Sequence, residues 1–213
     1  TTGGYASLRN VKAWNRKSVH QSPLSSRYGM MTDRIHQALD FMEACGLPLE
    51  AFSSVQGTAL YTSHEALLLE YEQSMLRQYE NKWYDLSAHC LWIGERTRQA
   101  DGAHVEFLRG VQNPVGVKVG PQATPDDCLR LIEKLNPENE SGKLVLICRM
   151  GAARATEALP KLFQAVKCEG RHVIWMCDPM HGNTETAETG HKTRNFDRIL
   201  SEVMSFFSAH AEV

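Results

Sequence analysis

The stretch that decides the fold is "KLVLICRMGAARATEALPKLFQAVKCEGRHVIWMCD", residues 143–178. It opens with an apolar run of strand type, continues with a helical pattern that closes at Gly170, and ends with a second apolar run. Two strands joined through a helix form a right-handed βαβ unit, and its strands lie parallel in one sheet. The stretch therefore predicts an α/β fold.

The same alternation extends over the chain from residue 85 onward. Four strand-type runs are predicted, at 86–94, 114–120, 143–151 and 171–178. Helical patterns follow them at 102–111, 125–135, 156–166 and 194–209, and Thr124 is the expected N-cap of the second helix. The strands begin about 28 residues apart, a spacing typical of a doubly wound sheet or of a (β/α)8 barrel.

Residues 1–84 differ from the rest because their apolar residues recur at helical spacing. Two amphipathic helices are predicted around 5–14 and 35–42, the second ending at Gly46. Thr62 and Glu65 have the spacing of a capping box ahead of a third helix. We therefore expect a helical extension over 1–84 that leads into βα units over 85–213.

Composition excludes several classes of function. With 213 residues and a formal net charge of -2, the chain has no overall basic field for nucleic acid or anionic membrane. No window reaches the roughly 20 apolar residues of a membrane span, and the start does not resemble a signal peptide. The six cysteines form no C-x-x-C pair, which favours reduced thiols in a cytosol-like compartment.

Charged residues follow each of the four predicted strands. Arg96, Lys118 and Arg149 lie at or after the first three strands, and Asp178 and His181 follow the fourth. Each alone would be an ordinary loop residue, but the carboxyl ends of parallel strands meet at one face. Three neighbouring cations need an anion between them, and guanidinium forks match carboxylate and phosphate oxygens. The predicted ligand is a small, multiply charged anion.

The residues themselves leave metal binding open. Asp178 and His181 are of metal-ligand type, but a metal site needs three or four ligands.

Five motifs, taken in order, resemble the class II (plant-type) 3-deoxy-D-arabino-heptulosonate-7-phosphate (DAHP) synthases. They are "TSHEALLLEYE" (62–72), "WIGERTRQADGAHVEFLRG" (92–110), "NPVGVKVGP" (113–121), "RMG" (149–151) and "CDPMHGNT" (177–184). The resemblance implies a metal-dependent transferase of the shikimate pathway, which supplies chorismate and the aromatic amino acids. Its reaction condenses phosphoenolpyruvate with erythrose 4-phosphate to DAHP and releases phosphate.

The resemblance also assigns roles to individual residues. Glu95, Arg96, Lys118 and Arg149 match the phosphoenolpyruvate site of the family. His181 matches a ligand of the divalent metal, commonly manganese or cobalt.

Three further assignments each have a plainer alternative. Glu65 resembles a glutamate near the erythrose 4-phosphate pocket, or is only the capping-box residue of a helix. Lys192 and Arg194 are further phosphate contacts, or only loop charges.

The family fold is a (β/α)8 TIM barrel, of which this chain is expected to carry about four βα units. The residues that complete the metal site are then missing, and the 213 residues alone are expected to be inactive. The resemblance also implies a homo-oligomer with aromatic amino acids as effectors, in the cytoplasm of a microbe or a plant plastid.

Two other functions stay open. One is a truncated, non-catalytic homologue that keeps an anion pocket and regulatory helices. The other is a different phosphate-handling barrel lyase.

Overall fold

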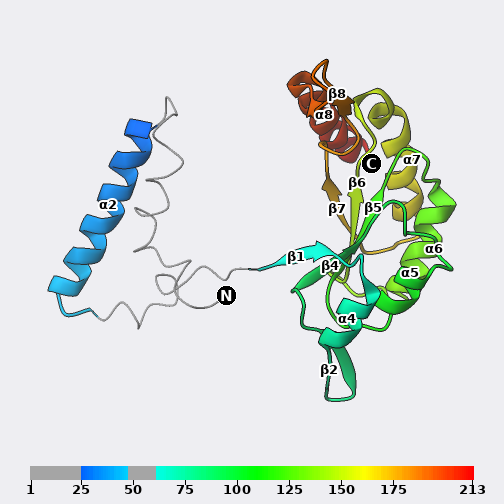
Figure 1. Ribbon diagram of the computed structural model, residues 1–213, viewed down its shortest axis with the longest axis horizontal. Coiled ribbons are helices and arrows are strands. Elements are labelled where there is room, and N and C mark those ends of the chain that lie inside the picture. The colour runs from blue at the N-terminus through cyan, green and yellow to red at the C-terminus, as the bar shows by residue number, and fades with distance from the viewer. Residues whose placement is uncertain (1–24, 48–60) are drawn as a thin grey trace. The chain divides into compact units, whose positions relative to one another are not determined.

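The computed structural model describes residues 25–47 and 61–213 (Figure 1). The helix predicted around 5–14 lies outside these residues. The chain divides into two compact units, Thr1–Tyr61 and Thr62–Val213. This division falls before the one expected between residues 84 and 85.

In the first unit the described residues form helix α2, Ser25–Ala44. It contains the predicted helical segment 35–42. The backbone at Gly46 has φ of +71°, a left-handed conformation that favours glycine. The N–H of Gly46 donates to the carbonyl of Glu43 at 2.9 Å, which closes the helix at the predicted residue.

The second unit is built on a parallel sheet of five strands in the order β1-β4-β5-β6-β7. These strands are β1 (Ser63–Glu65), β4 (Cys90–Ile93), β5 (Val115–Val119), β6 (Leu144–Cys148) and β7 (Ile174–Cys177). The last four confirm the four strands predicted from the sequence. Two hairpins accompany the sheet: β2 (Leu76–Tyr79) with β3 (Lys82–Asp85), and β8 (Thr184–Thr186) with β9 (Lys192–Arg194).

Helices connect the strands and follow the order of the sheet. They are α4 (Leu69–Met75), α5 (Ala103–Leu108), α6 (Pro125–Leu135), α7 (Ala152–Cys168) and α8 (Phe196–Glu212). From α5 to α8 each helix packs against the next, so these four form one continuous layer (Figure 1). A row of βα units with one helical layer fits part of an α/β barrel, whereas a doubly wound sheet has helices on both faces.

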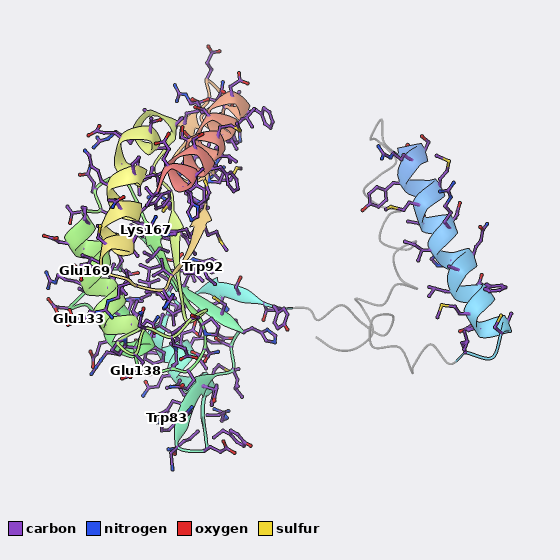
Figure 2. All side chains as sticks on the ribbon, turned by 180° about the vertical axis from the view of Figure 1, so that it is seen from behind. Trp83, Trp92, Glu133, Glu138, Lys167 and Glu169 are labelled. Carbon is purple, nitrogen blue, oxygen red and sulfur yellow. The ribbon has the colours of Figure 1, made fainter. Side chains whose placement is uncertain are left out.

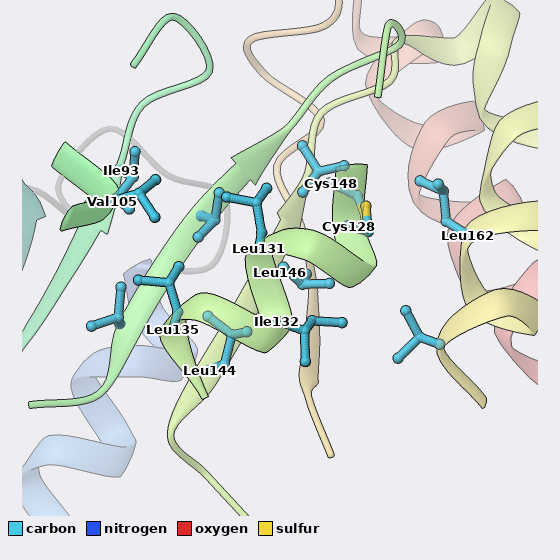
Figure 3. Close-up of a cluster of buried hydrophobic side chains, with 14 of the residues drawn as sticks. Ile93, Val105, Cys128, Leu131, Ile132, Leu135, Leu144, Leu146, Cys148 and Leu162 are labelled. Atoms are coloured by element: carbon cyan, nitrogen blue, oxygen red, sulfur yellow. The ribbon is translucent and has the colours of Figure 1, made fainter. Parts of the chain in front are cut away.

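The two faces of the sheet differ because side chains alternate along each strand. In β5, Val117 and Val119 are fully buried and belong to the hydrophobic core under the helices. Figure 3 shows this core, with Leu131 and Ile132 of α6 beside Leu146 of β6. Residues at the intervening positions, such as Lys118, face the opposite side of the sheet. The core thereby fixes which side chains reach the functional face.

The predicted bounds of helix α6, 125–135, and its predicted N-cap, Thr124, are both confirmed. The side-chain oxygen of Thr124 accepts a hydrogen bond from the backbone N–H of Asp127 at 3.1 Å. The Asp127 carboxylate accepts from the Thr124 N–H at 3.0 Å, which completes a capping box.

The prediction of a helix opened by Thr62 and Glu65 is wrong. Residues Ser63–Glu65 form strand β1, in which Glu65 pairs with Trp92 of β4. The helix of this segment, α4, begins only at Leu69. Pairing with β4 satisfies the backbone groups of the segment and outweighs the local capping signal.

The helical extension expected over 1–84 is therefore interrupted by a sheet strand and by the β2–β3 hairpin. The turn of this hairpin contains Glu80 and Asn81 with φ of 47° and 62°. Two successive left-handed residues are typical of a tight hairpin turn. The last helix also differs from the prediction, since Arg194 ends strand β9 and Asn195 is the N-cap of α8.

Within 25–47 and 61–213, no helix has the length and apolar character needed to cross a bilayer.

Candidate active site

A cavity of about 300 Å³ lies where the parallel strands end. Residues from β1, β4 and β5 and from the loops after β4, β6 and β7 line it: Glu65, Trp92, Gly94, Glu95, Arg96, Lys118, Arg149 and His181. These include every candidate residue named from the sequence except Asp178, Lys192 and Arg194. The convergence expected from the sheet topology is therefore present in the structure.

Lys118 and Asp178 form the closest ion pair of the site. Their Nζ and Oδ2 atoms are 2.5 Å apart, and the two side chains are only 16% and 11% exposed. Burial alone would raise the pKa of the Asp178 carboxyl, but the hydrogen bond and the positive charge of Lys118 outweigh burial and lower it. The Lys118 ammonium also lies 5.6 Å from the ring centre of Trp92, within the range of a cation–π contact.

His181 is held by the same carboxylate. Its Nδ1 lies 2.7 Å from Oδ2 of Asp178, while Oδ1 of Asp178 accepts hydrogen bonds from the backbone N–H of Met180 and of His181. A histidine fixed through Nδ1 presents Nε2 to a ligand, and carboxylates commonly orient metal-binding histidines in this way.

Arg149 follows β6 directly and reaches toward the loop after β7. Its guanidinium donates to the carbonyl oxygen of His181 at 2.6 Å. That oxygen is neutral, so the contact orients the guanidinium without neutralising its charge.

Glu95 lines the cavity, and its carboxylate lies close to the backbone at Gly120. Its Oε1 accepts from the Arg98 guanidinium at 3.1 Å, while its Oε2 is buried and accepts no hydrogen bond from the described residues. A Cβ atom at Gly120 would stand 2.7 to 2.9 Å from the Glu95 carboxylate. A Cβ atom at Gly94 would meet the Glu65 carboxylate at 2.1 Å. Two glycines therefore allow two carboxylates to approach the backbone.

Lys192 and Arg194 lie in β9 and do not line the cavity. Arg194 donates to the carbonyl oxygen of Met180 at 3.1 Å, which ties the β8–β9 hairpin to the loop that carries His181.

The sequence assigned no role to Trp92, and it placed Asp178 near the site without a partner. In Figure 2, Trp92 lies on the sheet, whereas Glu133 and Lys167 lie in the helical layer. The alternation of β4 gives the signal that finds Trp92, because Leu91 and Ile93 are fully buried in the core and the residue between them faces the other side.

The described residues do not complete a metal site. Among residues 25–47 and 61–213, no three or more His, Cys, Asp or Glu side chains are placed to hold a metal ion. His181 is the ligand that the family resemblance suggested. Cys177, close by in the sequence, packs against the hydrophobic core, and burial raises the pKa of its thiol to about 12.

Residues 1–213 match the class-II DAHP synthetase family. The chain belongs to this family. A relative from Streptomyces coelicolor, named phospho-2-dehydro-3-deoxyheptonate aldolase, is 49% identical over 212 residues, which are 99% of this chain and 46% of the relative.

A second relative has the same enzyme name. The phospho-2-dehydro-3-deoxyheptonate aldolase of Mycolicibacterium smegmatis is 48% identical over 217 residues, again 99% of this chain and 46% of the relative. The chain thus spans about half the length of the curated relatives it matches. Membership of the DAHP synthetase family overturns the alternative of an unrelated phosphate-handling lyase.

Proposed function

We propose that the protein acts in the condensation of phosphoenolpyruvate with erythrose 4-phosphate to DAHP. The observation that carries the proposal is the gathering of Arg96, Lys118 and Arg149 around one cavity. The names of the two relatives and the family match support the same reaction. A non-catalytic homologue is the less favoured alternative, because the cavity keeps the carboxylates and the histidine as well as the cations.

The reaction consumes one water and conserves phosphate. The methylene carbon of phosphoenolpyruvate forms a bond to the aldehyde carbon of erythrose 4-phosphate, and the aldehyde oxygen takes up a proton. Water then adds to the carbon that carries the phosphate ester, and inorganic phosphate leaves. Both substrates are anions that repel each other, so holding them together is the main task of the site.

The cavity residues suit this task in different ways. Arg149 and Arg96 offer forks of N–H donors for phosphate and carboxylate oxygens, with Lys118 as a point charge beside them. Lys118 is already placed by Asp178, so it need not be ordered when the substrate binds. Glu65 and Glu95 add carboxylate acceptors to the lining of the cavity.

We further propose a divalent cation, manganese or cobalt, as the cofactor, with His181 as one of its ligands. When bound, such a cation would polarise the aldehyde. The described residues supply fewer ligands than such a cation needs.

The test is an assay of the protein expressed from its complete gene. With manganese and both substrates we expect phosphate release that depends on erythrose 4-phosphate, and the Streptomyces coelicolor relative serves as positive control. Arg149→Lys keeps the charge but loses the fork, so kcat/KM should fall at least tenfold, about 1.4 kcal/mol of transition-state binding. Lys118→Ala should lower kcat/KM as well.

Lys161→Ala is the matched control, because Lys161 is a 64% exposed cation on α7 paired with Glu157. It should leave the kinetics unchanged. Wild-type kinetics in both Arg149→Lys and Lys118→Ala would place the anion site elsewhere.

A further inference from the structure

A buried carboxylate lies beside the candidate site without lining it. Glu202 of α8 is 1% exposed, although glutamate is rarely buried without partners. Its Oε1 accepts a hydrogen bond from the backbone N–H of Met150 at 2.8 Å. Its Oε2 accepts from the side-chain amide of Asn183 at 2.6 Å. One side chain on α8 therefore binds the loop after β6 and the loop after β7.

Asn183 extends this connection, because its amide is shared among three elements. The residue is 5% exposed. Its Oδ1 accepts from the N–H of Ala152 at 3.0 Å, at the start of α7, and its Nδ2 also donates to the carbonyl of Pro179 at 2.8 Å. Contacts at its oxygen and at its NH2 group fix the orientation of this amide. Asn183 thus joins the two loops a second time.

The same loops touch through their backbones at two glycines. A Cβ atom at Gly182 would stand 2.3 Å from the nitrogen of Gly151, and one at Gly151 would stand 2.7 Å from the carbonyl oxygen of Gly182. Gly151 also has φ of +79°. Neither loop can shift toward the other, and the Glu202 bonds keep them from moving apart.

The loops held in this way carry two of the candidate site residues. Met150 follows Arg149 in the chain, Asn183 lies two residues after His181, and the Arg149 guanidinium contacts the His181 carbonyl. We infer that Glu202 is a positioning residue that fixes Arg149 relative to the His181 loop and so sets the affinity for the anionic substrate. This inference rests on the proposed function, since phosphoenolpyruvate is its probe.

A purely structural role for Glu202 predicts something different. Burial raises the pKa of the Glu202 carboxyl, against the hydrogen bonds from Met150 and Asn183 that lower it. A buried acid is a poor way to fill a core, since an apolar side chain of similar volume often serves at least as well. If Glu202 only filled space, its replacement would change stability and leave substrate affinity as it was.

Glu202→Gln is the sharpest test because it keeps the shape. Glutamine has one acceptor in place of two, so its NH2 group must face either the Met150 N–H or the Asn183 amide. Isothermal titration calorimetry of the protein from its complete gene should show phosphoenolpyruvate binding weaker by about tenfold or more, the loss of one hydrogen bond to a charged group. Asn183→Ser, which cuts the link between the loops, should weaken binding as well.

Ser205→Ala is the matched control on the same helix. Its hydroxyl lies 3.2 Å from that of Thr156 on α7, so the change removes a contact between helices and leaves the loops untouched. Binding should equal that of the wild type, and melting temperatures of all variants should be recorded.

Weaker binding in every one of the two variants, Glu202→Gln and Asn183→Ser, that folds, with Ser205→Ala unchanged, supports the inference. Wild-type affinity in either folded variant overturns it, as does failure of both to fold, which would assign Glu202 to the core alone. A wild-type protein that does not bind phosphoenolpyruvate would instead contradict the proposed function.

Discussion

Replacing Asp178 by Asn tests the ion pair at the centre of the candidate site. Oδ1 of Asp178 accepts from two backbone N–H groups of its own loop, so the asparagine oxygen should keep that place. The asparagine NH2 group then faces Lys118 Nζ and His181 Nδ1, both of which now bond to Oδ2. Two charge-assisted contacts become contacts between donors.

The loss can be estimated from the burial of the pair. Removing one partner of a fully buried pair costs about 3–5 kcal/mol, and a hydrogen bond to a charged group contributes about 1.5–3 kcal/mol. The side chains of Lys118 and Asp178 are 16% and 11% exposed to solvent, so water screens the pair in part. We therefore expect the free energy of unfolding to fall by about 2–3 kcal/mol at pH 7.

Urea unfolding of the wild type and of Asp178→Asn, at pH 7 and in acid, measures this difference. The pKa of Asp178 lies below its ordinary value of 3.8, so its contribution is complete above 3.8 and is lost as pH falls through the folded pKa. The gap between the two proteins should close in acid. The control is Glu157→Gln, which breaks a pair exposed by 64% and 69% and should change the free energy of unfolding much less than Asp178→Asn does. Equal stability of Asp178→Asn and Glu157→Gln at pH 7 would refute the reasoning.

Three other outcomes are expected. Gly120→Ala should displace the Glu95 carboxylate and weaken phosphoenolpyruvate binding about tenfold, which is about 1.4 kcal/mol. Gly110→Ala is the control: its Cβ would meet its nearest atom at 3.4 Å, so it should bind normally in calorimetry. Burial raises the pKa of the Asp85 carboxyl despite hydrogen bonds from Ser87. The protonated form therefore contributes stability that is complete below pH 3.8 and is lost as pH rises through the folded pKa. In thermal melts, Asp85→Asn should reduce this dependence of the melting temperature on pH. Light scattering coupled to size-exclusion chromatography should show a homo-oligomer, and a monomer at micromolar concentration would contradict this.

The sheet was predictable where its strands are long and lie between helices. In β5 and β6 every residue but Lys118 is buried, and such continuous apolar runs between turn signals mark parallel strands. Strand β1 was missed because its three residues gain their conformation from hydrogen bonds to β4, about 27 positions away in the sequence. The short polar strands β8 and β9 also gave no periodic signal.

The candidate site was likewise predictable only in part. Arg149 and Lys118 were predictable because strand order alone brings the ends of parallel strands together. The individual contacts around them were not predictable, because they join residues far apart in the sequence. The contact of Lys118 with Asp178 spans 60 positions, and that of Met150 with Glu202 spans 52. Glu202 lies in a helix where an acidic residue reads as a surface residue, and only the packing of α8 on α7 buries it.

The charges of the site are not all compensated in the same way, and this bears on how an anion would bind. Lys118 is neutralised by Asp178, and Glu95 is paired with Arg98, so these groups are held in place before any ligand arrives. The Arg149 guanidinium contacts a neutral carbonyl and keeps its full charge. A dianionic phosphate therefore gains more from Arg149 than from Lys118, and the direction of Arg149 depends on the loop that Glu202 holds. Affinity for the anion and the geometry of that loop should rise and fall together, which is why a buried residue outside the cavity can control what binds inside it.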